Sequence, residues 1–314
     1  MSWCIGFDTS NYTTSVAAFN GIDVVSLKKI LPVKSGMCGL RQSDAVFLHI
    51  RQIPDLFSEL CRRIDTEDIC GVGISCKPRN VEKSYMPVFT VGTSFGECIS
   101  QLLNVPLYEF SHQDGHIMSA VHSADCYGIL EDEFLAVHLS GGTTEILLTR
   151  YNGKNFDNEI IGGTKDISAG QFIDRVGVAM GLCFPAGKDL SRLASEASDK
   201  VSLKAFVDGC NISYSGVETK AQQLIKSGVD FSVLALSVLD SVAVSLAKAL
   251  IHASRITGVN KIVFSGGVMS NDYIKSVLNT MLGSADLYYA LPEFSSDNSA
   301  GIAVLTYKRK FKKI

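Results

Sequence analysis

One short pattern occurs twice in this chain and constrains its fold more than any other feature. Residues 4–8 form an apolar run that ends in a small polar turn, and Thr13-Thr14 then open a second run that reaches residue 19. Residues 134–139 form another such run, followed by a glycine-containing turn and Thr143-Thr144. Two runs around a tight turn predict a β-hairpin. Because the order strand, turn, Thr-Thr, strand recurs after about 130 residues, we predict a duplicated domain.

Size and composition are those of a globular protein with two lobes. The chain has 314 residues, 46% of them hydrophobic and 19% charged, and this length favours more than one core. We expect an N-terminal lobe over residues 1–130 and a C-terminal lobe over residues 131–314, and the pattern leaves open whether the last helix returns to the first lobe. A net charge of −3 indicates no overall nucleic-acid-binding surface. The basic cluster at residues 308–313 is interpreted as a solvated terminus, with a contact to RNA phosphates as the alternative.

Cysteine usage and hydropathy predict a cytoplasmic protein. The nine cysteines are odd in number and form no Cys-x-x-Cys pair, which argues against a disulfide framework and against a structural zinc site. The N-terminal residues lack the basic and apolar regions of a signal peptide. The longest apolar stretch, around residues 231–256, is interrupted by Asp240, Ser241 and Lys248, so we expect no membrane span.

Hydrophobic periodicity predicts the main elements outside the two hairpins. Helices are predicted over residues 44–64, 90–103, 168–182 and 232–256, from about residue 271, and from residues 295–298 to the end. Strands are predicted over residues 71–75, 105–110, 261–264 and 288–291. Residues 76–87 are polar and contain two prolines, which predicts a loop.

Two histidines four residues apart form a candidate metal site. His112 and His116 fall in a predicted helix, where positions i and i+4 share one face and both imidazoles can reach one ion. No glutamate follows His112, so the zinc-protease motif is absent. The alternative is a pair of hydrogen-bonded histidines near a helix start. Asp297 is the natural third ligand, although an aspartate there could instead cap the closing helix.

Small glycine turns follow two of the apolar strands and form candidate phosphate sites. These turns are Ser140-Gly141-Gly142 and Ser265-Gly266-Gly267, and Asp8-Thr9-Ser10 is a third polar turn in the same setting. Glycine lets backbone N–H groups approach a phosphate closely. None of the three matches the Walker A or dinucleotide fingerprint, and ordinary tight turns also use paired glycines.

The order of these motifs along the chain resembles that of the TsaD/Kae1 family, the subunit that makes N6-threonylcarbamoyladenosine on tRNA. The likeness covers nearly the whole chain. It also includes Phe172-Ile173-Asp174-Arg175-Val176, Pro185-Ala186-Gly187 and Asn271. The resemblance implies a two-lobed α/β fold of the actin/hexokinase/Hsp70 (ASKHA) type, which the repeated hairpin also favours.

The resemblance further implies a role for individual residues. His112, His116 and Asp297 match the family's ligands for iron or zinc, and Asp8 matches a first-strand glutamate and is the candidate catalytic residue. The matching nucleotide- and substrate-binding positions are His138, Leu139, Ser140, Gly141, Gly142, Asp174, Gly187, Gly266, Gly267 and Asn271. Within this set, Asp174 would hold ribose hydroxyls, since carboxylate oxygens accept such hydrogen bonds well.

The implied reaction is transfer of a carbamoyl-type group from an adenylate. The metal orients and polarises threonylcarbamoyl-adenylate, an adenosine N6 amine attacks its carbonyl, and AMP leaves. The implied cofactors are one divalent iron or zinc ion and an adenine nucleotide (ATP, AMP or an acyl-adenylate), with Mg²⁺ allowed beside the nucleotide. The implied partners are tRNA and a second actin-like subunit or a second copy of this chain, and no membrane.

Several positions depart from the family pattern and indicate a divergent paralogue. Tyr12 and Thr13 replace an acidic pair, and residues 76–87 replace a glycine-proline-glycine-leucine loop. Thr143 follows the first glycine turn in place of a histidine or similar residue, and Lys188 follows Gly187 in place of proline. Two alternatives therefore stay open: carbamoyl transfer to a different acceptor, and a nucleotide-binding partner subunit without catalysis.

Overall fold

A computed structural model describes residues 1–10, 12–32, 40–296 and 299–312, and the chain separates into two compact units. Unit 1 comprises Met1–Glu131, Arg150–Asp157 and Asp297–Ile314, and unit 2 comprises Asp132–Thr149 and Asn158–Ser296. The last helix, α10 (Ala300–Phe311), thus belongs with the first unit. The predicted lobe boundary at residue 130 stays a prediction, because a compact unit is not by itself an independently folding domain.

Unit 1 is built on a five-stranded sheet of order β3-β2-β1-β4-β5. The strands are β1 (Trp3–Asp8), β2 (Thr13–Phe19), β3 (Val24–Ile30), β4 (Ile69–Lys77) and β5 (Leu107–Ser111). Its helices are α1 (Gln42–Cys61), α2 (Phe89–Leu103), α3 (His112–Ser123) and α10 (Ala300–Phe311). The β1–β2 pair is antiparallel, as the hairpin prediction requires, whereas β1, β4 and β5 run parallel.

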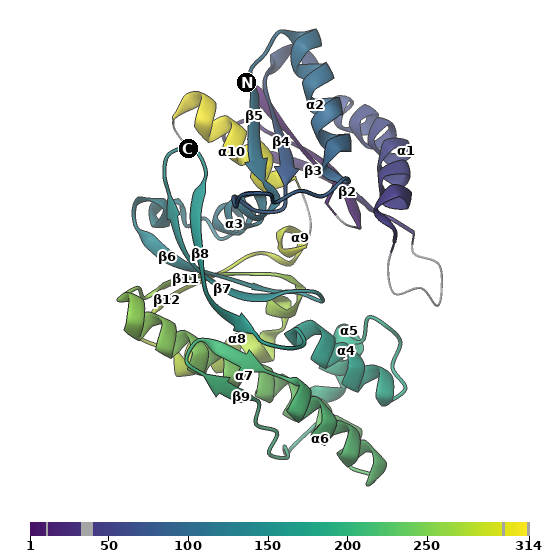
Figure 1. The fold of residues 1–314 in the computed structure, drawn as a ribbon, viewed down its shortest axis with the longest axis vertical. Coiled ribbons are helices and arrows are strands. Elements are labelled where there is room, and N and C mark those ends of the chain that lie inside the picture. The colour runs from purple at the N-terminus through teal and green to yellow at the C-terminus, as the bar shows by residue number, and fades with distance from the viewer. Residues whose placement is uncertain (11, 33–39, 297–298, 313–314) are drawn as a thin grey trace. The chain divides into compact units, whose positions relative to one another are not determined.

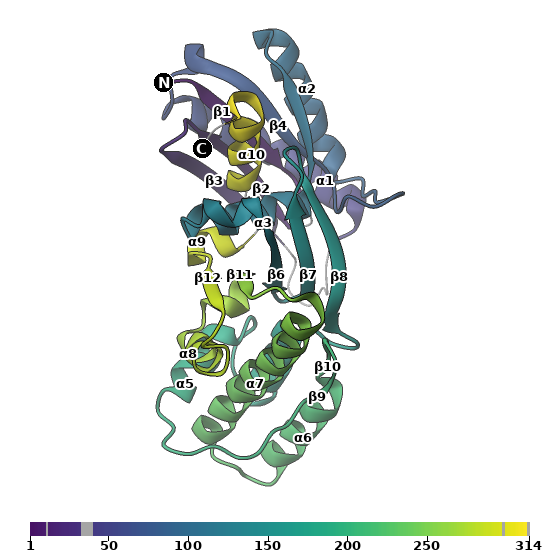
Figure 2. The same cartoon turned by 90° about the vertical axis from the view of Figure 1, so that its left-hand side faces the viewer.

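Helices cover both faces of this sheet (Figure 1, Figure 2). Ile5 and Phe7 point into a core shared with α1 and α2. Because successive residues of a strand face opposite sides, Gly6 faces α10, where an added Cβ would lie 2.7 Å from the Ala303 nitrogen. The chain's last helix therefore packs directly on its first strand.

Unit 2 repeats this architecture and extends it. Its sheet has the order β12-β11-β6-β7-β8-β10-β9, and the segment β8-β7-β6-β11-β12 matches β3-β2-β1-β4-β5 of unit 1 position for position. The strands are β6 (Glu133–Leu139), β7 (Thr144–Tyr151), β8 (Phe156–Thr164), β9 (Phe206–Asp208), β10 (Asn211–Ser213), β11 (Lys261–Ser265) and β12 (Asp286–Tyr289). The predicted duplication and the predicted fold class are confirmed.

The longest helix of unit 2 is α7 (Phe231–Thr257), which is apolar and packs mainly against α5 and α8. The others are α4 (Ala169–Ala179), α5 (Gly187–Ala194), α6 (Ser215–Lys226), α8 (Asp272–Met281) and α9 (Pro292–Ser295). By length and composition alone α7 could cross a membrane, but 72% of its most apolar window is buried inside the structure. It is a core helix.

Two sequence predictions of elements are corrected. The closing helix begins at Ala300, and Ser295 instead ends the separate short helix α9. The predicted loop at 76–87 begins two residues later, because β4 continues through Lys77 and pairs there with Ser111. Strands β3, β8, β9 and β10 and helices α5 and α6 were not predicted.

Candidate functional site

The histidine pair lies at the start of α3, where a capping box sets the helix phase. The Ser111 hydroxyl accepts a hydrogen bond from the Asp114 N–H, and the Asp114 carboxylate accepts one from the Ser111 N–H. The helix therefore begins at His112. One turn later His116 lies on the same face, and the two Nε2 atoms are 2.9 Å apart. The two imidazoles share one helix face and lie within hydrogen-bonding distance of each other, which is the alternative given above, and their role as metal ligands stays a prediction.

Asp8, at the end of β1, holds the first histidine of the pair. Its Oδ2 lies 2.7 Å from His112 Nδ1, while its Oδ1 accepts the Ser10 N–H at 2.8 Å. The Asp8 side chain is only 1% exposed. A carboxylate at Nδ1 places the proton there and leaves the Nε2 lone pair directed at His116, which is the arrangement that metal-ligating histidines use. Asp8 was predicted to be catalytic, and in the structure its contact is one that positions His112.

The donor set fits a borderline metal such as zinc or iron, since imidazole nitrogens suit both ions. The predicted third ligand, Asp297, lies outside the described residues. Among those that are described, no group of three His, Cys, Asp or Glu side chains forms a metal-binding cluster.

The segment that departs from the family pattern is attached to this helix. Asn80 Nδ2 donates to the Asp114 carboxylate at 2.7 Å and 2.9 Å, and the Gln113 N–H donates to the Pro78 carbonyl. Residues 78–80 are therefore held against the first turn of α3, next to the histidine pair.

Unit 2 contains a cavity of about 560 Å³, a volume within the range of small-molecule sites. Its wall includes five of the ten predicted nucleotide-binding positions: Gly141, Asp174, Gly187, Gly267 and Asn271. Apolar residues from three elements, Ile173, Leu239 and Val268, complete much of the wall. Sequence reasoning missed these three, because a buried apolar residue of a helix gives no local signal that it borders a cavity.

Two glycine turns meet at one edge of the sheet. Strands β6 and β11 are parallel neighbours with Ser265 opposite His138, so their following turns lie side by side. Gly266 has φ +94°, and an added Cβ would lie 2.0 Å from the Leu139 carbonyl oxygen. At Gly141, Gly142 and Gly267 an added Cβ would meet nothing within 4 Å. The absent side chains at Gly141 and Gly267 thus leave space at the cavity wall rather than permit internal packing.

Asp174, on α4, fastens the turn before α5. Its Oδ1 accepts the Ala186 N–H at 2.8 Å. Burial raises the pKa of this carboxyl group, and the N–H groups of Ala186 and Gly187 act in the opposite direction. Asp174 therefore lies at the N-terminus of α5 with its carboxylate at the cavity wall.

Asn271 is the N-cap of α8 and links it to α5. Its Oδ1 accepts the Ile274 N–H at 3.0 Å, and its Nδ2 donates to Ser191 Oγ at 2.6 Å. The side chain that was predicted to bind the nucleoside therefore has structural contacts as well.

Five predicted positions are not part of the cavity wall. His138 Nδ1 contacts Ser265 Oγ at 3.0 Å, and Ser140 Oγ accepts the Thr143 N–H at 3.1 Å. Leu139 is fully buried, so only its backbone could contact a ligand. Gly142 and Gly266 directly adjoin wall residues.

Comparison with known proteins shows the family of the chain. The sequence profile of TsaD, tRNA N6-adenosine threonylcarbamoyltransferase, matches residues 39–304. The chain belongs to the TsaD family. A tRNA N6-adenosine threonylcarbamoyltransferase of Christiangramia forsetii is 29% identical over 83% of this chain and 78% of its own length. The corresponding protein of Thermus thermophilus is 27% identical over 98% of this chain and 93% of its own length.

Solved structures similar to this family member confirm the fold alone. Full-length HypF in a phosphate- and nucleotide-bound form has a TM-score of 0.63 and 17% identity, covering 98% of this chain and 55% of HypF. A ROK family glucokinase from Streptomyces griseus has a TM-score of 0.55 and 10% identity, covering 98% of this chain and 99% of the kinase. The shared element is the duplicated ASKHA architecture.

Proposed function

We propose that this protein binds an adenine nucleotide in the unit 2 cavity and transfers a threonylcarbamoyl group to an adenosine of tRNA. Family membership supports the reaction class. The observation that carries the proposal is the cavity itself, whose wall brings together Gly141, Asp174, Gly187, Gly267 and Asn271 from four separate stretches of sequence. These positions were predicted from the order of motifs along the chain, and their presence in the wall of one cavity supports the proposal.

The cavity offers the contacts that a nucleotide requires. Gly141 and Gly267 let phosphate oxygens approach backbone N–H groups. The Asp174 carboxylate has acceptor capacity beyond its bond to Ala186 and can hold ribose hydroxyls. Ile173, Leu239 and Val268 provide apolar contact for a base.

The histidine pair is the proposed metal site. His112, His116 and Asp297 would hold one iron or zinc ion, which when bound supplies Lewis-acid polarisation of the acyl carbonyl. Asp8 acts through His112 by keeping its Nε2 unprotonated. Its further role as a catalytic residue stays a prediction.

The transfer step exchanges one bond for another. The adenosine N6 lone pair forms a bond to the carbamoyl carbon, the bond between that carbon and the AMP phosphate oxygen breaks, and the N6 proton leaves to solvent or a base. The protein contributes orientation, since glycine turns and Asp174 would fix the AMP part of the substrate.

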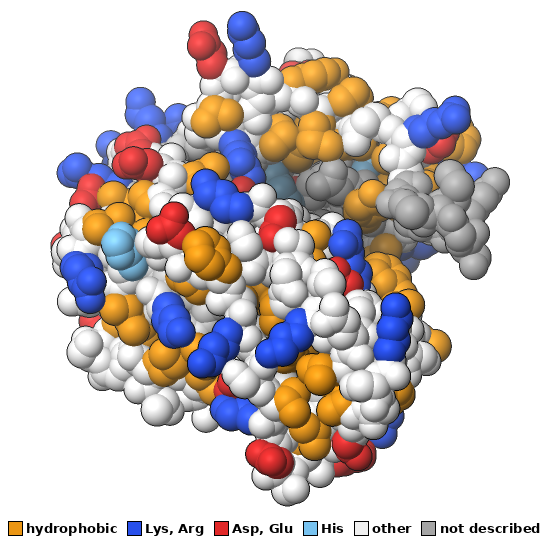
Figure 3. Space-filling view, turned by 60° about the horizontal axis from the view of Figure 1, so that its bottom comes forward, with side chains coloured by type: hydrophobic (Ala, Val, Ile, Leu, Met, Phe, Trp, Pro, Cys, Tyr) orange, Lys and Arg blue, Asp and Glu red, His pale blue; other side chains and the backbone are white. Residues whose placement is uncertain are grey.

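The protein would act in the cytoplasm. Its partners would be tRNA, a small adenylate, and a second actin-like subunit or a second copy of this chain. Mg²⁺ could bind together with the nucleotide. The net charge of −3 gives no strong electrostatic signal for RNA. On the face shown in Figure 3, Lys and Arg side chains of described residues lie scattered among hydrophobic and acidic ones without one extended basic patch. RNA binding would then depend on local contacts more than on net charge.

One observation keeps a second function open. Tyr12 and Thr13 stand where the family has an acidic pair, and Thr13 begins β2 directly after the Asp8 turn. Loss of two carboxylates at this place favours either another carbamoyl acceptor or a nucleotide-binding subunit without turnover.

Modified-nucleoside analysis of tRNA from cells that lack this protein tests the proposal. Loss of N6-threonylcarbamoyladenosine, restored by the wild-type gene and not by an Asp174→Ala variant, is the expected result. Asp208→Ala, an exposed position on β9, is the matched control and should restore the nucleoside. An unchanged tRNA profile together with AMP release from a carbamoyl-adenylate would assign a different acceptor. Tight nucleotide binding without any turnover would assign the partner role.

A further inference from the structure

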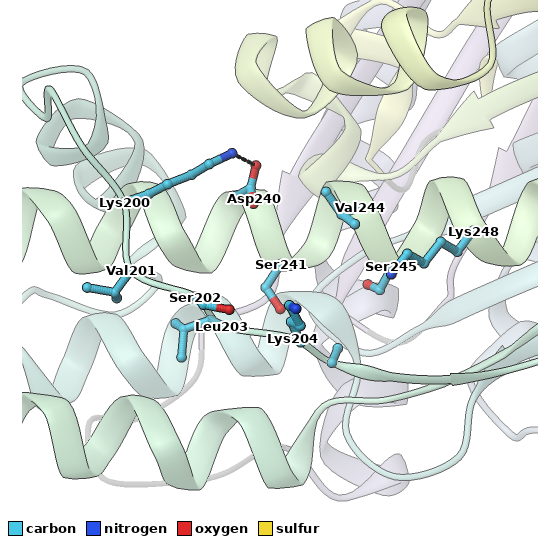
Figure 4. Close-up of a pocket in the computed structure, with 11 residues that line it drawn as sticks. Lys200, Val201, Ser202, Leu203, Lys204, Asp240, Ser241, Val244, Ser245 and Lys248 are labelled. Carbon is cyan, nitrogen blue, oxygen red and sulfur yellow. Dashed lines mark hydrogen bonds and ion pairs between the residues drawn. The ribbon is translucent and has the colours of Figure 1, made fainter.

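A second cavity in unit 2, of about 270 Å³, lies between α7 and the segment 200–205 (Figure 4). Three lysines line it, Lys200, Lys204 and Lys248, and the only carboxylate in its wall is that of Asp240. Three positive charges and one negative charge give the wall a net charge of +2. A cavity of this size and sign suits a small anion.

A buried hydroxyl in this wall has no hydrogen-bond partner. Ser241 is 3% exposed, and its Oγ forms no hydrogen bond within the described part of the chain. Its side chain points from α7 toward the segment that carries Ser202 and Lys204 (Figure 4). Most buried hydroxyls are hydrogen-bonded. Four serine hydroxyls of the described residues are buried without a partner, those of Ser10, Ser75, Ser241 and Ser299, and Ser241 is the one in the lining of this cavity.

The two serines one turn before and one turn after Ser241 on α7 both have hydrogen-bond partners. Ser237 Oγ accepts the Val201 N–H at 2.9 Å and donates to the Val233 carbonyl at 2.6 Å. Ser245 Oγ donates to the Val242 carbonyl at 3.0 Å and contacts Tyr214 Oη at 3.1 Å. Ser245 also lines the cavity, and of the three serines spaced four residues apart only Ser241 lacks a partner.

The positive charge of the wall is only partly neutralised. Lys200 Nζ lies 2.6 Å from Asp240 Oδ1, which also accepts the Tyr273 hydroxyl at 2.7 Å. Within the residues that the structure describes, Lys204 and Lys248 form no ion pair and are exposed. Two ammonium groups are therefore available to a ligand beside one buried hydroxyl donor.

We propose that this cavity binds a small oxyanion, the phosphate or carboxylate group of a metabolite, between Ser241, Lys204 and Lys248. The hydroxyl would donate one hydrogen bond, and the ammonium groups would add charge-assisted ones. Asp240 stays paired with Lys200, which neutralises its charge and limits its repulsion of the anion. The site is separate from the nucleotide cavity, since no residue belongs to both walls.

Isothermal titration calorimetry with inorganic phosphate and, in a separate arm, with acetate tests this site. The titrations use the full chain with AMP at saturation, so that the nucleotide cavity is not the binding site measured. We expect one saturable site in the wild type. Ser241→Ala should weaken binding at least about fivefold, and the double change Lys204→Ala with Lys248→Ala at least about tenfold. Lys226→Ala, an exposed lysine in the last turn of α6, should stay within about twofold of the wild type.

The two arms distinguish the sources of the ligand. Tighter binding of phosphate assigns phosphorylated metabolites, and tighter binding of acetate assigns carboxylates. Circular dichroism checks folding, and Ser241→Ala should raise the melting temperature in buffer without either ion, because it removes a buried hydroxyl without a partner. If Ser241→Ala does not fold, the lysine variants decide.

Two results would overturn the site: no saturable binding in either arm, or binding that the serine and lysine variants leave unchanged. Asp174→Ala separates this inference from the proposed function. That variant should lose AMP and retain the anion, whereas a failure of AMP binding in the wild type would count against the nucleotide cavity alone.

Discussion

At the scale of single residues, the two glycines after β11 have different requirements. Gly266 combines φ +94° with an approach that leaves no room for a Cβ beside Leu139, while Gly267 has open space around it. Gly266→Ala should therefore lower the free energy of unfolding by roughly 2–5 kcal/mol, the sum of left-handed strain and overpacking. Urea denaturation measures this.

Gly267→Ala is the matched control for that experiment. We expect its free energy of unfolding to change by less than about 1 kcal/mol, whereas its affinity for AMP should fall because the new methyl group enters the cavity wall. Equal losses of stability in the two variants would contradict the conclusion that folding requires glycine at 266 and not at 267.

Asp8 provides a second test at the same scale. In Asp8→Asn the amide can accept either the Ser10 N–H or the His112 Nδ1–H through its oxygen, and it must then present an NH₂ group to the other. If the NH₂ group faces His112, it donates to Nδ1 and moves the ring proton to Nε2; if the oxygen faces His112, the tautomer is kept but the NH₂ group lies against the Ser10 N–H. We expect zinc affinity to fall about 10- to 100-fold, measured by titration with metal and by metal content after purification. Asp23→Asn, an exposed position between β2 and β3, should bind zinc normally, and equal affinity in both variants would refute the positioning role.

At the scale of elements, one aspartate fastens the start of α6 to the segment after β8. Asp166 Oδ1 accepts the N–H groups of Ile167 and Tyr214, and Oδ2 accepts the N–H and hydroxyl of Ser215. Burial acts to raise the pKa of Asp166, but these hydrogen bonds together outweigh it and lower the pKa to about 2. Because the folded pKa lies below the ordinary value of 3.8, the stabilisation is present above pH 4 and disappears as the pH falls.

Asp166→Asn should therefore lower the free energy of unfolding by about 1 kcal/mol at pH 7. This value is smaller than the pKa shift alone would give, because solvent screens the charge of an exposed side chain. The difference from the wild type should begin to shrink near pH 4 and vanish near pH 2. Urea denaturation at several pH values between 7 and 3 measures it. Asp286→Asn, exposed at the start of β12, is the control, and a pH-independent difference for Asp166→Asn would contradict the ionic origin.

At the scale of the whole molecule, the end of the chain completes a unit that its beginning started. Ile302 of α10 is fully buried and lies where Cβ atoms on Gly6, Gly73 and Gly115 would contact it. Ile302→Ala should lower the free energy of unfolding by roughly 2–5 kcal/mol through the cavity it creates. Ile256→Ala, on an exposed position of α7, should change it by less than about 1 kcal/mol. Thermal and urea unfolding compare the two, and similar values would mean that α10 does not stabilise unit 1.

Much of this architecture could be predicted from local patterns. The hairpins at 4–19 and 134–148, the helix at 232–256 and the shared face of His112 and His116 all follow from periodicities of two and 3.6 residues, which each segment carries by itself. The strand β3 was missed because this edge strand is mostly exposed and lacks a strong apolar run. Helices α5 and α6 are short and begin without a side-chain cap that the sequence would reveal.

The sequence by itself determined the duplicated α/β fold, the family and the residue types of the candidate site, because these depend on local spacing and on motif order. Tertiary structure decided which residues share a space. Only the parallel pairing of β6 and β11 brings Gly141 to Gly267, only the end of β1 beside α3 gives His112 its carboxylate, and only the packing of 200–205 on α7 leaves Ser241 beside two lysines. These contacts join residues far apart in the chain, and no local pattern encodes the distance between them.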